Sequence, residues 1–370
     1  MNHTNTSAVE GAAPSHSVRA ASGSDSGRMV TLFVRILAGT LVAMALLFLF
    51  SNYLTFWRDW PGVIGLFAHY GENSRAALEG EALTLGWVQL ALYMAAVTAT
   101  IGFVIFGPRR SLRADAALWS GFAAYIVRAA FWTVLLVGLV DSLVSFIRIE
   151  GWLQMLVGES LTQELGRPQF RGTYVHYPLV LVALVIASFV RSLGFTWLAL
   201  LVVLAEFQIV ISRFVFSYEQ AFMGDLVRFW YAALFLFASA YTLVNDGHVR
   251  VDVLYARFEH RTKAWANILG IILLGLPLCW VILTTGMWTK GSSIVSPLLS
   301  FEITQSGYGL YVKYLMVGFL VVFALSMIAQ FASYLLSNVA DLREEDEEGD
   351  DHGMRVQSNS TGDGMTIASE

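Results

Sequence analysis

Several polar or ionisable side chains lie inside long apolar runs of the sequence, where they are costly and could do chemistry. A charge near the middle of a bilayer costs about 2.5–3.5 kcal/mol on insertion scales, so it is usually neutralised, paired or turned toward protein. Glu206 lies near the middle of the run 195–216. It could be a site for a coupling ion or a proton, or a polar contact at a helix or subunit interface. The other side chains of this kind are Gln208 in the same run, and Arg128 and Asp141 in the run 116–147, which are candidate partners of Glu206.

A second candidate is the charged segment 245–255, which separates two apolar runs. Asp246 and Gly247 would end a helix, because glycine favours the left-handed conformation that closes a helix C-terminus. His248 and Arg250 would then lie near the carbonyl end, where positive charge is favourable, and Asp252 could cap the next helix. The segment is therefore either a corner whose charges are satisfied locally, or a docking surface for another membrane subunit or for lipid headgroups.

The histidines and the single cysteine give no sign of a redox or metal centre. None of the seven histidines lies centrally in an apolar run, where a haem ligand would be needed. Cys279 has no second cysteine with which to pair. The sequence also lacks the Gly-x-Ser-x-Gly and His-Glu-x-x-His motifs of hydrolases. We therefore expect no catalytic residue, no cofactor and no bound metal.

The composition indicates a membrane protein. Of the 370 residues, 56% are hydrophobic and only 14% are charged, whereas a soluble protein has about 25% charged residues. The net charge of −5 comes largely from an acidic block at 341–351, which is typical of a disordered tail. No basic patch is dense enough for nucleic acid.

The apolar runs predict an all-α polytopic bundle of about eight spans. The run 174–216 would be more than about 60 Å long as one helix, and Arg191 and Gly194 interrupt it, so we expect two spans joined by a tight hairpin. With eight spans, the basic loops after the second, fourth and sixth spans share one side with both termini, as the positive-inside rule favours. The expected spans are 29–54, 83–106, one within 116–147, 174–190, 195–216, 226–245, 265–287 and 311–336.

A short amphipathic helix is expected after the sixth span. Val251, Leu254, Tyr255 and Phe258 have the i, i+3, i+4, i+7 spacing of one helix face. The basic residues lie largely off that face, which is typical of a helix lying on the cytoplasmic membrane surface.

From about residue 195 to residue 336 the chain resembles the small membrane subunit of the tripartite ATP-independent periplasmic (TRAP) transporters, the DctQ-like family. The final part of this segment is most similar to the mannitol or chloroaromatic-type branch of the family. The charged segment matches the family signature, and its place after the second of four helices fits the family. Asp225 opens the next span where the family usually has a Glu, so the acid is kept but not its length. The other resembling residues are Gln208 and Arg213 in the segment that begins at Glu206, and Gly224, Pro277, Ser296, Pro297, Lys313, Gly318, Phe319 and Gln330.

The resemblance implies a scaffold subunit of the bacterial inner membrane. Its partners would be a large permease subunit, which holds the substrate and sodium sites, and a periplasmic solute-binding protein. The family has four spans and this chain has about four more, so the resemblance divides the membrane part into two, and the composition adds a tail at each end. The divisions are a disordered tail 1–28, an N-terminal transmembrane extension 29–193, a small-permease domain 194–340 and an acidic disordered tail 341–370.

The alternative is a stand-alone membrane transporter or channel. Secondary transporters usually bind substrate at broken helices that recur in two halves of the chain. Gly275 and Pro277 interrupt one expected span, but no counterpart mirrors them. The sequence therefore favours a subunit that does not itself carry the substrate.

Overall fold

The chain folds into a helical bundle in the computed structural model, which describes residues 25–71, 78–107, 110–191, 195–244, 255–304 and 309–343. All regular secondary structure in these ranges is helical, so the predicted all-α fold is confirmed. The first half contains α1 (Asp25–Trp57), α2 (Gly62–Tyr70), α3 (Glu81–Phe106), α4 (Leu112–Ile149), α5 (Leu153–Leu165), α6 (Pro168–Arg171), the π-helical turn η1 (Gly172–His176) and α7 (Tyr177–Phe189). The second half contains α8 (Phe195–Phe216), α9 (Ala221–Val244), the 3₁₀ turn η2 (Tyr255–Arg257), α10 (His260–Gly270), the π-helical turn η3 (Ile271–Gly275), α11 (Leu276–Met287), α12 (Val295–Ser300) and α13 (Lys313–Leu342).

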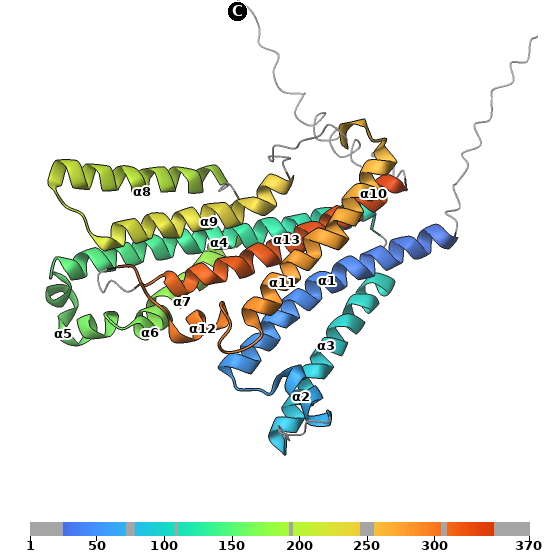
Figure 1. The fold of residues 1–370 in the computed structure, drawn as a ribbon, viewed down its shortest axis with the longest axis horizontal. Helices are drawn as coiled ribbons and strands as arrows, with labels where there is room; N and C mark the ends of the chain where they lie inside the picture. The colour runs from blue at the N-terminus through green and yellow to red at the C-terminus, as the bar shows by residue number, and fades with distance from the viewer. Residues whose placement is uncertain are drawn as a thin grey trace, which may run out of the picture.

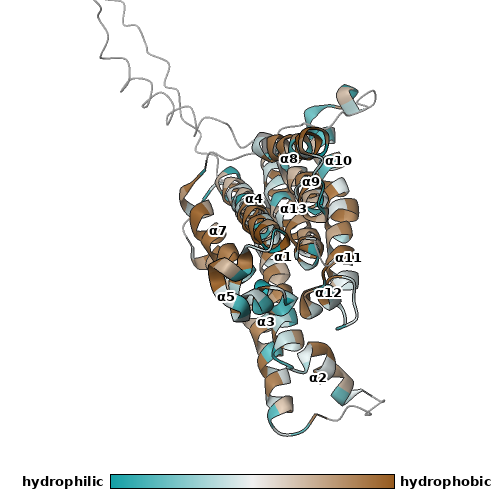
Figure 2. Ribbon diagram, turned by 90° about the vertical axis from the view of Figure 1, so that its left-hand side faces the viewer, coloured by the Kyte–Doolittle hydropathy of each residue, from teal (hydrophilic) through white to brown (hydrophobic). Residues whose placement is uncertain are grey.

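Eight helices in the described ranges are long and apolar enough to cross a membrane, which confirms the predicted number. Hydrophobic residues, brown in Figure 2, predominate along them. The fourth span begins at Pro168, earlier than predicted, because α6, η1 and α7 form one continuous helical rod. The spans are Gly27–Trp57, Glu81–Phe106, Leu112–Ile149, Pro168–Phe189, Trp197–Phe216, Ala221–Ala240, His260–Met287 and Lys313–Leu342.

The predicted division of 174–216 into two spans is also confirmed. Helix α7 ends at Phe189 and α8 begins at Phe195, and residues 192–194 between them lie outside the described part. Helix α7 packs mainly on α4, whereas α8 packs mainly on α9. The two spans are therefore close in sequence but pack against different partners.

Helices α4 and α13 form the centre of the bundle and share its most extensive helix contact (Figure 1). Helix α4 also packs on α7 and α9, and α13 also packs on α1, α9, α10 and α11. Helix α8 lies at one edge of the bundle, and α3, which packs on α1 and α2, lies at the other (Figure 1). The C-terminal helices are thus interleaved with the N-terminal ones.

The start of α1 and the end of α13 lie at the same end of the bundle, as an even number of spans requires (Figure 1). Two ion pairs join the helices there. Arg35 Nε of α1 lies 2.5 Å from Asp115 Oδ2 of α4, and Arg113 Nη2 of α4 lies 3.0 Å from Asp341 Oδ1 of α13.

Two prolines explain the two π-helical turns. Pro178 and Pro277 each lack the backbone N–H that an α-helix needs, and their rings crowd the preceding turn. The chain responds by widening that turn: Tyr177 N–H bonds to Gly172 O, and Leu276 N–H bonds to Ile271 O, five residues back in each case. The sequence therefore sets both irregular turns.

Parts of the predicted organisation fall outside the described residues. The predicted tails lie there except for residues 25–28 in α1 and 341–343 at the end of α13. The predicted surface helix 251–265 is described only from Tyr255, where the single turn η2 is followed by α10 of the seventh span.

Candidate functional site

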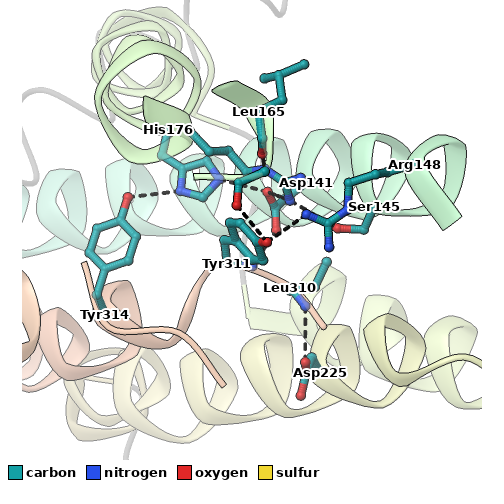
Figure 3. A network of polar contacts seen from close by, with 11 residues as sticks. Asp141, Ser145, Arg148, Leu165, His176, Asp225, Leu310, Tyr311 and Tyr314 are labelled. Carbon is teal, nitrogen blue, oxygen red and sulfur yellow. Dashed lines mark hydrogen bonds and ion pairs between the residues drawn. The ribbon is translucent and has the colours of Figure 1, made fainter. Parts of the chain in front are cut away.

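A buried polar network joins three segments of the chain at the end of the bundle opposite to the described chain ends (Figure 3). Its centre is Asp141, which lies near the C-terminal end of α4. Arg171 and His176 come from α6 and η1, at the start of the fourth span. Tyr311 and Tyr314 come from the segment that leads into α13 and from its first turn. Helix α4 has 38 residues and is about 57 Å long, so its ends extend beyond a hydrocarbon core of about 30 Å.

Asp141 has charged or polar partners on both carboxylate oxygens. Its Oδ1 accepts a hydrogen bond from Arg171 Nη1 at 3.0 Å and lies 3.0 Å from His176 Nε2. Its Oδ2 accepts from the backbone N–H of Tyr311 at 2.8 Å. The side chains of Asp141, Arg171 and His176 are 0% exposed. A buried ion pair is tolerated only when such additional hydrogen bonds satisfy both charges.

Arg171 is held from several sides. Its Nε donates to Leu165 O at 2.9 Å, and its Nη1 also donates to Ser145 Oγ at 3.1 Å. The guanidinium lies over the ring of Tyr311, 4.1 Å from the ring centroid, in a cation–π arrangement. Its Nη2 is buried and has no hydrogen-bond partner among the described residues.

His176 connects Asp141 to α13. Its Nδ1 lies 2.9 Å from the hydroxyl of Tyr314, and the two rings are nearly parallel. A neutral imidazole protonated on Nε2 satisfies both contacts, because it donates to Asp141 and accepts from the tyrosine hydroxyl. The network therefore runs without a break from α4 through η1 to α13.

Close approach of η1 to α13 depends on Gly172. A Cβ atom on this residue would lie 2.3 Å from the Phe301 ring and 3.1 Å from the Tyr314 hydroxyl. Phe301 is itself packed between the rings of Tyr177 and Tyr314, and its backbone is left-handed with φ of 50°. No side chain larger than hydrogen fits without displacing these rings.

The segment before α13 is fixed by two carboxylates on successive backbone N–H groups. Tyr311 N–H donates to Asp141 of α4, and Leu310 N–H donates to Asp225 of α9 at 3.1 Å (Figure 3). Asp225 also accepts from Thr304 Oγ1 at 3.2 Å. Asp225 was predicted at the start of the sixth span. It lies one turn inside α9, which begins at Ala221, and it is buried.

A further contact joins the network to the segment after α5. Arg148 Nη1 donates to the hydroxyl of Tyr311 at 2.6 Å, and that hydroxyl donates to Gly166 O at 3.0 Å. Nearby, the hydroxyl of Tyr218 donates to Glu150 at 2.6 Å. Burial and the neighbouring carboxylate raise the pKa of Tyr218 to about 12, so this hydroxyl remains a donor at physiological pH. Side-chain hydrogen bonds thus connect the helices and loops at this end of the bundle.

The remaining predicted residues are dispersed. Arg213 lies near the end of α8, with its Nε 3.5 Å from Glu219 Oε2, and both side chains are exposed. Lys313 begins α13 and pairs with Glu302. The predicted motif residues Asp246, Gly247, His248, Arg250 and Asp252 lie outside the described residues.

The predicted pairing of Glu206 with Arg128 or Asp141 is not formed. Asp141 is bound to Arg171, His176 and Tyr311 instead. Glu206 and Gln208 are exposed on α8, and Arg128 is half-buried on α4 with a buried, unpartnered Nε.

Arg171, His176, Tyr311, Tyr314 and Ser145 were not predicted as site residues. Arg171 and His176 could have been identified from the sequence. Asp141 lies near the end of the third span and needs a partner at its own depth, and these two residues lie where the fourth span begins. The tyrosines lie far away in sequence, and only the contact between α4 and α13 brings them to Asp141.

Comparison with known proteins gives one match. Residues 199–339 match a family model. That model is described as the DctQ component of the tripartite ATP-independent periplasmic transporters. The match covers less than half of the chain, and it neither tests the predicted branch nor explains the N-terminal spans. No curated protein and no solved structure matched.

The DctQ-like segment, residues 199–339, extends from α8 to α13. The buried network crosses its boundary: Asp141, Arg171 and His176 precede the segment, whereas Tyr311 and Tyr314 belong to it. The helices before the segment are therefore tied to it through buried charges as well as through apolar packing.

Proposed function

We propose that this chain is the small membrane subunit of a TRAP-type secondary transporter. In this role it supports a large permease subunit during sodium-driven uptake of a small organic solute, which a periplasmic binding protein delivers. The match of residues 199–339 to the DctQ component supports the family role. The buried network supports the mechanical part of the proposal.

A scaffold must stay fixed while its partner moves. Conformational change in proteins requires elements with two alternative packings of similar energy. The contacts in this region oppose this, because sliding α13 past α4 and α9 would separate the buried Asp141 and Asp225 carboxylates from the backbone N–H groups of Tyr311 and Leu310. We infer that the chain provides a rigid surface against which the moving part of the large subunit shifts.

We also propose how the regions divide this role. Residues 194–340 form the small-permease domain, and residues 29–193 thicken the scaffold, since α4 of that region packs between α7, α9 and α13. The chain lies in the inner membrane with both termini in the cytoplasm. The charged segment containing Asp246, Gly247, His248, Arg250 and Asp252 is a docking surface at the cytoplasmic face. Wild-type yield of the large subunit with an Arg250→Ala, Asp252→Ala variant would contradict that docking role.

Reconstitution tests the proposal. Vesicles that contain this chain, a large TRAP permease subunit that co-purifies with it and a periplasmic binding protein should accumulate solute when a sodium gradient is applied. Vesicles that lack any one of the three should not. Uptake by this chain alone would instead support the alternative, a stand-alone transporter or channel.

A further inference from the structure

The most unusual exposed side chain in the described spans is Glu206. It lies near the middle of α8, ten residues before the helix ends at Phe216 and about 15 Å from that end. Its side chain is exposed, and it has no hydrogen bond or ion pair within the part of the chain that is described. A carboxylate facing lipid at this depth carries a cost of a few kcal/mol. A neighbouring protein that covers it removes this cost.

The face of α8 around Glu206 is also not covered by another helix in the described part of the chain. Helix α8 lies at the edge of the bundle and packs mainly on α9 through Leu198, Ala205 and their neighbours (Figure 1). The opposite face carries exposed apolar side chains, among them Val203 and Phe207. Apolar side chains alone would be satisfied by lipid, so Glu206 distinguishes this face from an ordinary lipid-facing one.

A groove continues this surface toward the end of α8. It has a volume of about 490 Å³ and is lined by Ile209 of α8, by residues of α9 that include Asp225 and Arg228, and by Thr304. Ile209 lies one helical turn from Glu206, so the groove opens beside the carboxylate. Arg228 is largely exposed at its rim. The exposed face of α8 and the groove beside it together form a strip with a carboxylate near the middle of α8 and polar groups toward its end.

We propose that this strip seats one transmembrane helix of the large membrane subunit, and that this helix presents a cationic side chain or a strong hydrogen-bond donor to Glu206. The inference rests on the proposed function and adds the location and the chemistry of the contact. Charge complementarity favours a protein helix over lipid as the occupant, because the Glu206 carboxylate needs a hydrogen-bond donor near the middle of the bilayer and lipid chains provide none. Polar contacts between transmembrane helices contribute about 0.6–2 kcal/mol, enough to fix the orientation of a partner helix.

Site-specific photocross-linking of the assembled complex tests the location. The photoreactive residue replaces Val203, one turn from Glu206, or Met94 in the middle of α3 as the matched control. Both side chains are 62% exposed and lie near the middle of their helices. We expect the large subunit to be cross-linked from position 203 at least tenfold more than from position 94.

Three other results overturn the inference. A product that joins two copies of this chain would assign the strip to self-association. Absence of a product at position 203, in a complex that still contains the large subunit, would place the interface elsewhere while leaving the proposed function intact. Failure of the wild-type chain to co-purify with any large subunit would overturn both the proposed function and this inference.

Charge substitutions test the chemistry. Glu206→Lys should lower the yield of co-purified large subunit at least tenfold, because two donors would then face each other. Glu206→Gln, which keeps an acceptor, should stay within about threefold of wild type. Gln208→Lys is the control for placing a lysine in α8, because at 3.6 residues per turn Gln208 points to the other flank. Equal yields from Glu206→Lys and wild type would contradict the proposed contact, even if the photocross-link is found.

Discussion

At the scale of single residues, two carboxylates in spans have opposite environments. Asp141 is buried and has an arginine, a histidine and a backbone N–H as partners. Glu206 is exposed and has no partner among the described residues. Since both charges would be costly in lipid, the first is satisfied within the chain and the second by a neighbouring chain in our proposal. The same physical requirement thus has an intramolecular solution and an intermolecular one.

The importance of the buried pair can be tested by replacing Arg171. Arg171→Met keeps most of the side-chain volume but leaves Asp141 buried without its main cation, which should lower the free energy of unfolding by about 3–5 kcal/mol. Arg167→Met is the matched control, because Arg167 lies one turn earlier and forms an exposed pair with Glu164. Its loss should cost less than about 1 kcal/mol. Denaturant titration in detergent measures both values, and equal stabilities would contradict a stabilising role for the network.

At the scale of elements, the proline after each π-helical turn determines where a helix departs from regular α-helical geometry. Pro178 widens η1 so that Gly172 faces Phe301 and His176 faces Asp141. Pro277 has the same effect on η3, where a Cβ atom on Gly275 would lie 2.7 Å from the Phe331 ring of α13. In both cases a glycine within the widened turn allows close packing of another segment. The sequence contains both prolines and glycines, but their packing partners are distant in the chain.

Substitution of Gly172 tests the close approach at η1. Gly172→Ala should destabilise the protein by about 1–3 kcal/mol, because the added methyl group meets the Phe301 ring and that ring is held by two tyrosines. Gly102→Ala in α3 is the control, because a Cβ atom there meets nothing within 4 Å. It should be neutral or stabilising by up to about 1 kcal/mol, since alanine is the better helix former. The unfolding midpoint in detergent should therefore fall for Gly172→Ala and stay level or rise for Gly102→Ala. A Gly172→Ala midpoint at or above the wild-type value would show that the space at η1 is not restrictive.

At the scale of the whole molecule, the eight spans found in the described ranges form one interleaved bundle. The DctQ-like segment supplies α8 to α13, yet its last helix has its most extensive contact with α4, which precedes the segment. Ion pairs join α1, α4 and α13 at one end, and the network of Asp141 joins α4, η1 and α13 at the other. Fixing both ends of the same helices suits a rigid scaffold.

The topology can be tested by cysteine labelling after Cys279, the single cysteine, is replaced by alanine. Glu159→Cys in α5 and Arg191→Cys after α7 are both at exposed positions and are separated by one span. In right-side-out membrane vesicles, an impermeant maleimide should label position 159 directly and position 191 only after the membrane is opened. Labelling of both positions from one side would contradict the eight-span arrangement. The reverse pattern would retain eight spans but place the termini outside.

The sequence by itself determined the fold class, the number of spans and the resemblance to the DctQ component. These depend on local properties: the length of apolar runs, the charge of short loops and the order of residues in one segment. The tertiary structure decided which polar groups meet. Asp141 was recognised as a residue needing a partner, but its partners Arg171, His176 and Tyr311 became evident only from the rotation and depth of α4 relative to η1 and α13. The sequence pattern gives neither the rotation nor the depth of a helix, because the bilayer requires only that each helix be apolar. Side-chain packing between helices fixes how they face one another.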